Sequence, residues 1–252
     1  MFFAILLSLI AAARPVYADS FWQKLTWTTD DGVRLAGLYH PADRSGAYTW
    51  VLLHGLGSYK EEWEPFARQA AGQGNGIFLF DARGHGESNH LKSGGAISYK
   101  DWQSTGPGSP WSRMPSDVAS AFQMLRKRFG LSDTEIAVGG ASLGANVALV
   151  YASAHASVPA LLLLSPGIEY AGIQAPSAFY AYRGRPVFMA ASPNDAYAYS
   201  SARRLADLSP GPACRMVDGK NGHGVNMLDA EFTETLLNWM KGLDGNRDRR
   251  AS

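Results

Sequence analysis

The chain has 252 residues, of which 46% are hydrophobic and 18% are charged, and its formal net charge is +1. A chain of this length buries a substantial core without metals or disulfides, and it accommodates one large domain or two small ones. The near-neutral charge and the lack of a Lys/Arg block argue against nucleic acid as a partner. The single cysteine, Cys214, has no internal disulfide partner and no metal-ligand spacing around it.

The first residues have the pattern of a secretory signal. Phe2–Ala13 is apolar except for Ser8, and Val16-Tyr17-Ala18 offers small residues at the two positions that a signal peptidase reads. We therefore expect a signal peptide over residues 1–18 and an exported, periplasmic or secreted protein. No Lys or Arg precedes the apolar run, so an uncleaved anchor and a folded N-terminal helix stay open as alternatives. The run is short for a bilayer, and we expect no stable membrane span after processing.

From Phe21 onward, strand patterns come first and then alternate with helix patterns. Phe21–Thr29 and Val33–Tyr39 each alternate around an Asp-Asp-Gly turn, which predicts a β-hairpin. Short apolar runs predict buried strands, and runs with one apolar face predict helices. The predicted strands are Thr49–Leu53, Gly76–Phe80, Glu135–Val138, Ala160–Leu164, Pro186–Ala191 and Cys214–Val217. The predicted helices are Glu61–Ala71, Ser116–Phe129 with Ser116-Asp117 as its cap, Asn146–Ala152, Ser200–Leu208 and a closing helix from Leu228 to Met240.

Three segments fall outside this alternation. Residues 89–115 are rich in Gly, Ser and Pro, residues 165–185 form a short aromatic connection, and Lys241–Ser252 is a polar tail that we expect to fray. No linker divides the rest of the chain, so residues 19–252 are interpreted as one domain. The alternation predicts an α/β fold, with a mostly parallel sheet covered by helices on both faces.

One serine stands between a predicted strand and a predicted helix. In Gly140-Ala141-Ser142-Leu143-Gly144, the two glycines carry no Cβ atoms that would collide in a sharp strand-to-helix turn. This is the Gly-x-Ser-x-Gly pattern of a nucleophile elbow. The pentapeptide alone is a weak signal, because a glycine-rich turn that happens to hold a serine gives the same letters.

The chain also supplies partners for a reactive serine. Near pH 7 a serine hydroxyl needs a base to accept its proton, and the base needs a carboxylate to orient it. Asp195 follows the second strand after Ser142, and His223 follows the last strand. Since such groups gather at the carboxyl ends of parallel strands, we expect Ser142, Asp195 and His223 to form a catalytic triad. Asp218 and Glu169 are the weaker alternatives for the acid.

Taken together, these motifs resemble the serine hydrolases of the α/β-hydrolase superfamily, esterase- and lipase-like members included. The resemblance covers roughly Val33 to Met240 and rests on four elements in order: His54-Gly55, Asp81-x-Arg-Gly-His-Gly-x-Ser88, the serine elbow, and the late Asp and His. It implies an eight-stranded sheet whose second strand is antiparallel. It also implies an oxyanion hole made by the backbone N–H groups of Leu56 and Leu143.

The resemblance implies hydrolysis of carboxylic esters through an acyl-enzyme, with a small-molecule acyl substrate, no cofactor and no metal. A peptidase or amidase, a thioesterase, an acyltransferase and a non-catalytic binding module on the same fold remain alternatives. Two features depart from common family forms: Ser192-Pro-Asn-Asp195 lacks the glycine that often opens the acid loop, and His54-Gly55 lacks a run of glycines. His54, His85, Asp81 and Arg83 are expected to shape loops rather than to react. Nothing in the sequence fixes an oligomeric state.

Overall fold

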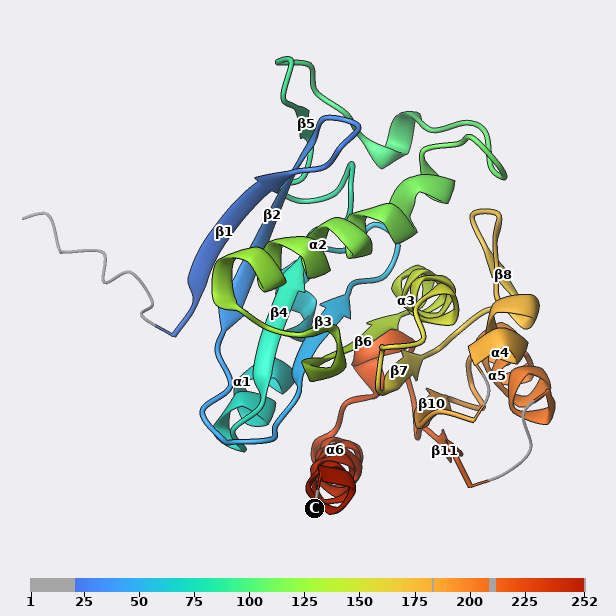
Figure 1. The fold of residues 1–252 in the computed structure, drawn as a ribbon. Coiled ribbons are helices and arrows are strands. Elements are labelled where there is room, and N and C mark those ends of the chain that lie inside the picture. The colour runs from blue at the N-terminus through green and yellow to red at the C-terminus, as the bar shows by residue number, and fades with distance from the viewer. Residues whose placement is uncertain (1–20, 183, 209–211, 252) are drawn as a thin grey trace, which may run out of the picture.

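Wholly apolar segments form the middle of the sheet. The computed structural model describes residues 21–182, 184–208 and 212–251 (Figure 1), so the predicted signal peptide at residues 1–18 lies outside the described residues. Five strands are buried along their whole length. Such fully buried apolar strands are typical of a parallel sheet with both faces covered. They are β3 (Thr49–Leu53), β4 (Gly76–Phe80), β6 (Ile136–Ala141), β7 (Leu161–Leu164) and β10 (Val187–Ala191).

The strand order is β1-β2-β4-β3-β6-β7-β10-β11. The predicted hairpin is confirmed as β1 (Gln23–Thr28) and β2 (Val33–His40), and β2 is antiparallel to both β1 and β4. β11 (Cys214–Asp218) closes the far edge and is parallel to β10. The path therefore has the eight strands and the antiparallel second strand that the family resemblance implies. A ninth strand, β5 (His90–Leu91), pairs with β2 and was not predicted.

Side-chain alternation divides the core into two layers. Val51 and Leu53 of β3 face the layer that contains α2 (Met114–Phe129), α3 (Leu143–Ala154) and α5 (Ala196–Asp207). Trp50 and Leu52 face the other layer, with α1 (Glu64–Gly72) and α6 (Ala230–Ala251). Successive strand residues point to opposite faces, so one short apolar run supplies both cores. Figure 1 shows the helices on the two sides of the twisted sheet. Among the residues described, no helix has the length and apolarity to cross a membrane.

Several helix boundaries differ from prediction for local reasons. The α2 helix begins at Met114, with Pro115 in its first turn, so the predicted cap at Ser116-Asp117 is wrong. The α5 helix begins at Ala196, one turn before Ser200, because Asp195 caps it and accepts a hydrogen bond from the Ala198 N–H at 3.3 Å. The α6 backbone continues as helix to Ala251, past the polar boundary at Lys241.

The connection between β7 and β10 forms a small cap. It contains the hairpin β8 (Glu169–Tyr170) and β9 (Ile173–Gln174), followed by α4 (Pro176–Tyr182). Figure 1 shows this hairpin projecting near α4 and α5. The hairpin tip packs against the long loop that follows β4, because a Cβ on Gly172 would lie 2.6 Å from the Gly106 nitrogen.

Buried ion pairs hold the loop that follows β4. The Asp117 carboxylate accepts hydrogen bonds from Arg83 Nε at 2.9 Å and from Arg83 Nη2 at 2.6 Å, and both side chains are buried. Asp81 accepts from the Lys60 N–H and the Lys60 ammonium at 2.8 and 2.9 Å. The expectation that Arg83 and Asp81 shape this loop agrees with these contacts.

We predict that Asp117→Ala destabilises the protein by about 3–5 kcal/mol, because Arg83 would keep a buried charge with part of its partner set removed. Urea unfolding followed by circular dichroism measures the change. Arg126→Ala on the same helix is the matched control: Arg126 pairs with Asp133 in an exposed ion pair, whose loss costs about 0–1 kcal/mol. Equal losses for the two variants would contradict the prediction.

Candidate active site

Ser142 occupies a strained corner between β6 and α3. Its backbone has φ 54° and ψ −122°, in the positive-φ region that residues with a Cβ rarely enter. A Cβ on Gly140 would lie 2.3 Å from the Gly144 carbonyl carbon, and one on Gly144 would lie 2.5 Å from the His54 carbonyl oxygen. Both glycines are therefore required for the turn, which has the geometry expected of a nucleophile elbow.

Neighbouring backbone groups fix the serine. The Ser142 N–H donates to the Leu164 carbonyl at 2.8 Å, at the end of β7. Leu143 is the first residue of α3, so its N–H belongs to the turn that has no partner within the helix. Gly55 lies against the serine, because a Cβ there would be 3.5 Å from the Ser142 Cβ. The predicted oxyanion loop and the predicted nucleophile are therefore neighbours.

A hydrogen-bond relay braces the His54-Gly55-Leu56 loop. His54 Nε2 accepts from the Ala82 N–H at 3.0 Å, which leaves the proton on Nδ1 to be donated to the Gly55 carbonyl at 2.8 Å. Burial lowers the pKa of His54, so the ring is neutral at pH 7. On the other side of the loop, Glu62 accepts from the Gly55 N–H at 2.9 Å. Burial raises the pKa of Glu62 against the effect of this bond and of Ser58.

Asp195 and His223 meet at the ends of β10 and β11. Asp195 Oδ2 forms a short hydrogen bond with His223 Nδ1, which directs the other ring nitrogen away from the carboxylate. The Gly224 N–H donates to Ser165 Oγ at 2.8 Å, and a Cβ on Gly224 would be 3.0 Å from the Ala141 Cβ. The loop that carries His223 is therefore fastened beside the serine elbow.

The rival acids have other partners. Asp218 accepts from the Tyr199 hydroxyl at 3.1 Å and pairs with Arg203 on the exposed face of α5. The Glu169 carboxylate accepts from the Gly172 N–H and from the Gln174 amide within the cap hairpin. Of the three carboxylates, Asp195 alone is hydrogen-bonded to His223 in the described chain.

The two predicted oxyanion residues differ in their side chains. The N–H of Leu143 lies at the start of α3, where the helix dipole favours negative charge, and its side chain is buried. The Leu143 side chain lines a cavity of about 10 Å³ together with His54, Gly55 and His85. The Leu56 side chain is 52% exposed and extends toward solvent. Only one of the two leucine side chains therefore lines a described cavity beside the serine.

His85 belongs to the brace rather than to the reactive groups. Its Nδ1 hydrogen-bonds the Arg83 carbonyl at 2.9 Å, and its ring stacks on Tyr99 with centroids 4.1 Å apart. Burial, with a smaller effect from His54, lowers the pKa of His85 to about 4, which keeps the ring neutral. Its Nε2 is a buried atom without a hydrogen-bond partner in the described part of the chain.

Four further residues shape the site without having been assigned a role from the sequence: Glu62, Asn146, Ser165 and Tyr170. Asn146 gave the clearest signal, because it is a polar residue in the apolar first turns of a helix, four positions after Ser142. Tyr170 was noticed only as one of several aromatics in the cap. Ser165 has a positive φ of 50° and accepts the bond from Gly224, a role that no sequence pattern indicates.

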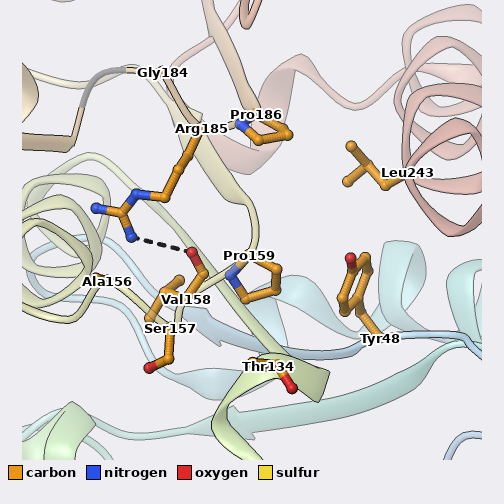
Figure 2. Close-up of a pocket in the computed structure, with 10 residues that line it drawn as sticks. All are labelled: Tyr48, Thr134, Ala156, Ser157, Val158, Pro159, Gly184, Arg185, Pro186 and Leu243. Carbon is orange, nitrogen blue, oxygen red and sulfur yellow. Dashed lines mark hydrogen bonds between the residues drawn. The ribbon is translucent and has the colours of Figure 1, made fainter. Parts of the chain in front are cut away.

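A larger cavity lies away from these groups. It has a volume of about 360 Å³ and is lined by residues that precede the strands, among them Tyr48, Pro159 and Pro186 (Figure 2). Arg185 extends along its wall and donates to the Val158 carbonyl at 3.1 Å and to the Ala152 carbonyl at 3.0 Å. The bond to Ala152 caps the C-terminal end of α3. The cavity therefore lies at the amino-terminal ends of the strands, whereas Ser142 follows the carboxyl end of β6.

Comparisons with known proteins agree with this architecture. Residues 47–196 match a family model described as serine aminopeptidase, S33, a range that includes Ser142 and Asp195 and ends before His223. No curated protein matches the chain in sequence. Among solved structures, DcsB in complex with its substrate analogue is similar with a TM-score of 0.72 and 14% identity, over 89% of this chain and 98% of that one.

Two further solved structures, an esterase and a dienelactone hydrolase, are also similar to this chain. The esterase Pf2001 of Pyrococcus furiosus is similar with a TM-score of 0.68 and 16% identity, over 87% of this chain and 91% of that one. A dienelactone hydrolase from Anabaena variabilis is similar with a TM-score of 0.64 and 14% identity, over 88% of this chain and 98% of that one. At these identities the likeness establishes the α/β-hydrolase fold.

We predict that Gly144→Ala destabilises the protein by about 1–3 kcal/mol, because the new methyl group would press on the backbone oxygens of Leu53 and His54. Denaturant unfolding gives the change. Gly72→Ala, in α1, is the control: a Cβ at Gly72 meets no atom of the described residues within 4 Å, so the replacement should stabilise by up to about 1 kcal/mol. A neutral Gly144→Ala would show that the helix and strand ends are free to separate.

Proposed function

The chain belongs to the serine aminopeptidase family, S33, of α/β-hydrolases, and we propose that it is a serine hydrolase that cleaves carboxylic esters through an acyl-enzyme. Two observations support the proposal: an elbow serine after β6, and a hydrogen-bonded Asp195–His223 pair whose loop packs beside that elbow through Gly224 and Ala141. The three residues come from loops that follow three different strands, as general base, orienting acid and nucleophile do on this fold.

In the proposed reaction, Ser142 Oγ attacks the acyl carbonyl while His223 Nε2 accepts the serine proton. Asp195 holds the imidazole through Nδ1 and stabilises the imidazolium that forms. His223 then donates this proton to the departing alcohol, which breaks the ester bond. Water attacks the acyl-enzyme through the same histidine and releases the carboxylic acid, and no cofactor takes part in any step.

The Leu143 and Leu56 N–H groups are proposed to bind the oxyanion. The bond from the Gly55 N–H to Glu62 orients this segment of the loop. The next N–H along the chain is that of Leu56, which is proposed to face the substrate. Each such donor contributes about 3 kcal/mol of transition-state stabilisation. Because both donors are backbone groups, side-chain replacement at these leucines should change substrate fit more than the chemistry.

The ester preference is supported by structurally similar proteins, among them the Pyrococcus furiosus esterase Pf2001 and Est1E from Butyrivibrio proteoclasticus. A peptidase is the second candidate, and the family description as a serine aminopeptidase is the specific observation that favours it. The same triad protonates an alcohol or an amine leaving group, so a panel of aryl esters, thioesters and aminoacyl amides separates the two candidates.

We predict that a fluorophosphonate probe labels Ser142 and that aryl ester hydrolysis is lost together with labelling in Ser142→Ala. Mass spectrometry of the labelled peptide identifies the modified residue, and a spectrophotometric assay measures hydrolysis. A wild-type chain that is neither labelled nor active on any member of the panel would favour a non-catalytic role. Cleavage of aminoacyl amides well above esters would replace the esterase proposal by the peptidase.

We predict that Asp195→Asn lowers kcat by about 10³- to 10⁴-fold, because an amide cannot stabilise the imidazolium and favours the wrong tautomer of His223. Asp218→Asn is the matched control, since Asp218 pairs with Tyr199 and Arg203 on the exposed face, and it should keep nearly full activity. Steady-state kinetics on one aryl ester measures both variants. A larger loss in Asp218→Asn than in Asp195→Asn would reassign the acid.

A further inference from the structure

The cap hairpin is fastened to the helix that follows the nucleophile. The Asn146 side chain, buried in the first turns of α3, donates through Nδ2 to the Gly167 carbonyl and to the Ile173 carbonyl, both at 3.0 Å. Its Oδ1 accepts from the Gly167 N–H at 3.1 Å. One side chain thus binds the backbone on both sides of the hairpin, and the cap is held in a fixed place relative to Ser142.

A second clamp comes from the helix that follows the acid. The Tyr197 hydroxyl, on the first turn of α5, donates to the Glu169 carbonyl at 2.7 Å and accepts from the Glu169 N–H at 3.1 Å. Its ring lies edge-to-face with Tyr170, with centroids 5.6 Å apart. The hairpin is therefore bound to both helices whose N-terminal ends carry proposed catalytic residues.

The residue that these clamps place is Tyr170. Its ring packs on Gly167, where a Cβ would lie 2.6 Å from the Tyr170 Cε2 atom. The ring lies edge-to-face with the His223 imidazole at a centroid distance of 6.5 Å and an interplanar angle of 88°. The Tyr170 hydroxyl is 3.4 Å from the carbonyl oxygen of Ser165, the residue after the Leu164 carbonyl that binds the Ser142 N–H. The phenol therefore lies beside the His223 ring, next to the end of β7 that binds the Ser142 N–H.

The protonation state of this phenol makes it a donor. Burial raises the pKa of Tyr170, the nearby Asp195 carboxylate raises it further, and an interaction with the Ser142 side chain acts in the opposite direction. An ordinary tyrosine is already protonated at pH 7, so a raised pKa leaves the Tyr170 hydroxyl protonated there. An O–H···O bond is normally 2.5–3.0 Å long, so the 3.4 Å contact with the Ser165 carbonyl is a weak one.

We propose that Tyr170 is a further catalytic residue, whose phenol O–H donates to Ser142 Oγ and holds the serine hydroxyl in line with His223. The inference rests on the proposed function of Ser142. A serine hydroxyl has one proton and two lone pairs, so accepting from Tyr170 leaves its own proton for the imidazole. As that proton departs, negative charge grows on Oγ and the bond from the neutral phenol strengthens. No covalent step is added, and Tyr170 keeps its proton throughout.

The test compares Tyr170→Phe with the wild type in two assays. We expect kcat on a soluble aryl ester to fall about 10- to 100-fold with KM within about 2-fold, since a misplaced nucleophile slows chemistry more than binding. The rate constant for fluorophosphonate labelling of Ser142 should fall by the same factor. Tm should stay within about 3 °C, because the ring and its packing are retained.

Two comparison variants make the result specific. Tyr180→Phe removes a hydroxyl from an exposed tyrosine on α4 of the same cap and should change neither assay. Tyr170→Ala removes ring and hydroxyl together, and its loss of kcat should be at least as large as that of Tyr170→Phe.

Three outcomes would overturn the role of the phenol. They are a Tyr170→Phe variant with unchanged kcat and labelling, one that raises KM alone, and one that changes only Tm. The failure of the wider proposal has a different signature, because the wild-type chain itself would then resist labelling and leave aryl esters intact, as Ser142→Ala does. That result would remove the role of Tyr170 as well.

Discussion

The site depends on one close approach, between the start of α3 and the end of β3. The helix can reach the strand because Gly140 and Gly144 present only hydrogen where any other residue would place carbon against backbone. This contact aligns the first N–H groups of α3 with the loop after β3, and it pushes Ser142 into its positive-φ conformation. The strain at the serine persists because packing on both sides of the turn determines it, as is common at functional sites.

Around this corner, buried polar groups hold the loops in place, and Ser142 itself is only 8% exposed. His54, Asp81 and the Arg83–Asp117 pair are almost entirely buried. By contrast, the His223 side chain is 45% exposed, and Asp195 behind it is 19% exposed. The cost of burying charge is thus confined to residues that shape the loops.

The sequence predicted the elements that depend on hydrophobic pattern. Thr49–Leu53 and Gly76–Phe80 have the boundaries of β3 and β4, and the order and direction of the strands follow from alternation with helices together with the family resemblance. Asp117 shows where pattern fails: the same letters suit a helix cap, and only the fold reveals that Arg83 is its partner. The cap hairpin was missed because its strands have two residues each and its turn uses Ala171 at φ 50° instead of an Asn-Gly signal.

For the site itself, the sequence predicted Ser142, Asp195 and His223 because each lies in the turn or loop after a predicted strand and Ser142 has the Gly-x-Ser-x-Gly pattern. The bond between Asp195 and His223 is an observation, whereas the triad as working machinery stays a prediction. No role was predicted for Asn146, Ser165 and Tyr170, because their roles arise from contacts between segments about 20 to 60 residues apart in the chain. Periodicity carries no information about such contacts.

The double attachment of the hairpin through Asn146 and Tyr197 bears on turnover. An enzyme whose cap swings open spends part of each cycle waiting for that swing, and loop motions of this kind take microseconds to milliseconds. Here hydrogen bonds from α3 and α5 hold the hairpin, so we expect the cap to be in place before a substrate arrives. Substrate selectivity would then depend on the shape of this fixed cap. Substitutions at the hairpin tip would change which substrates fit, without changing a rate of cap opening.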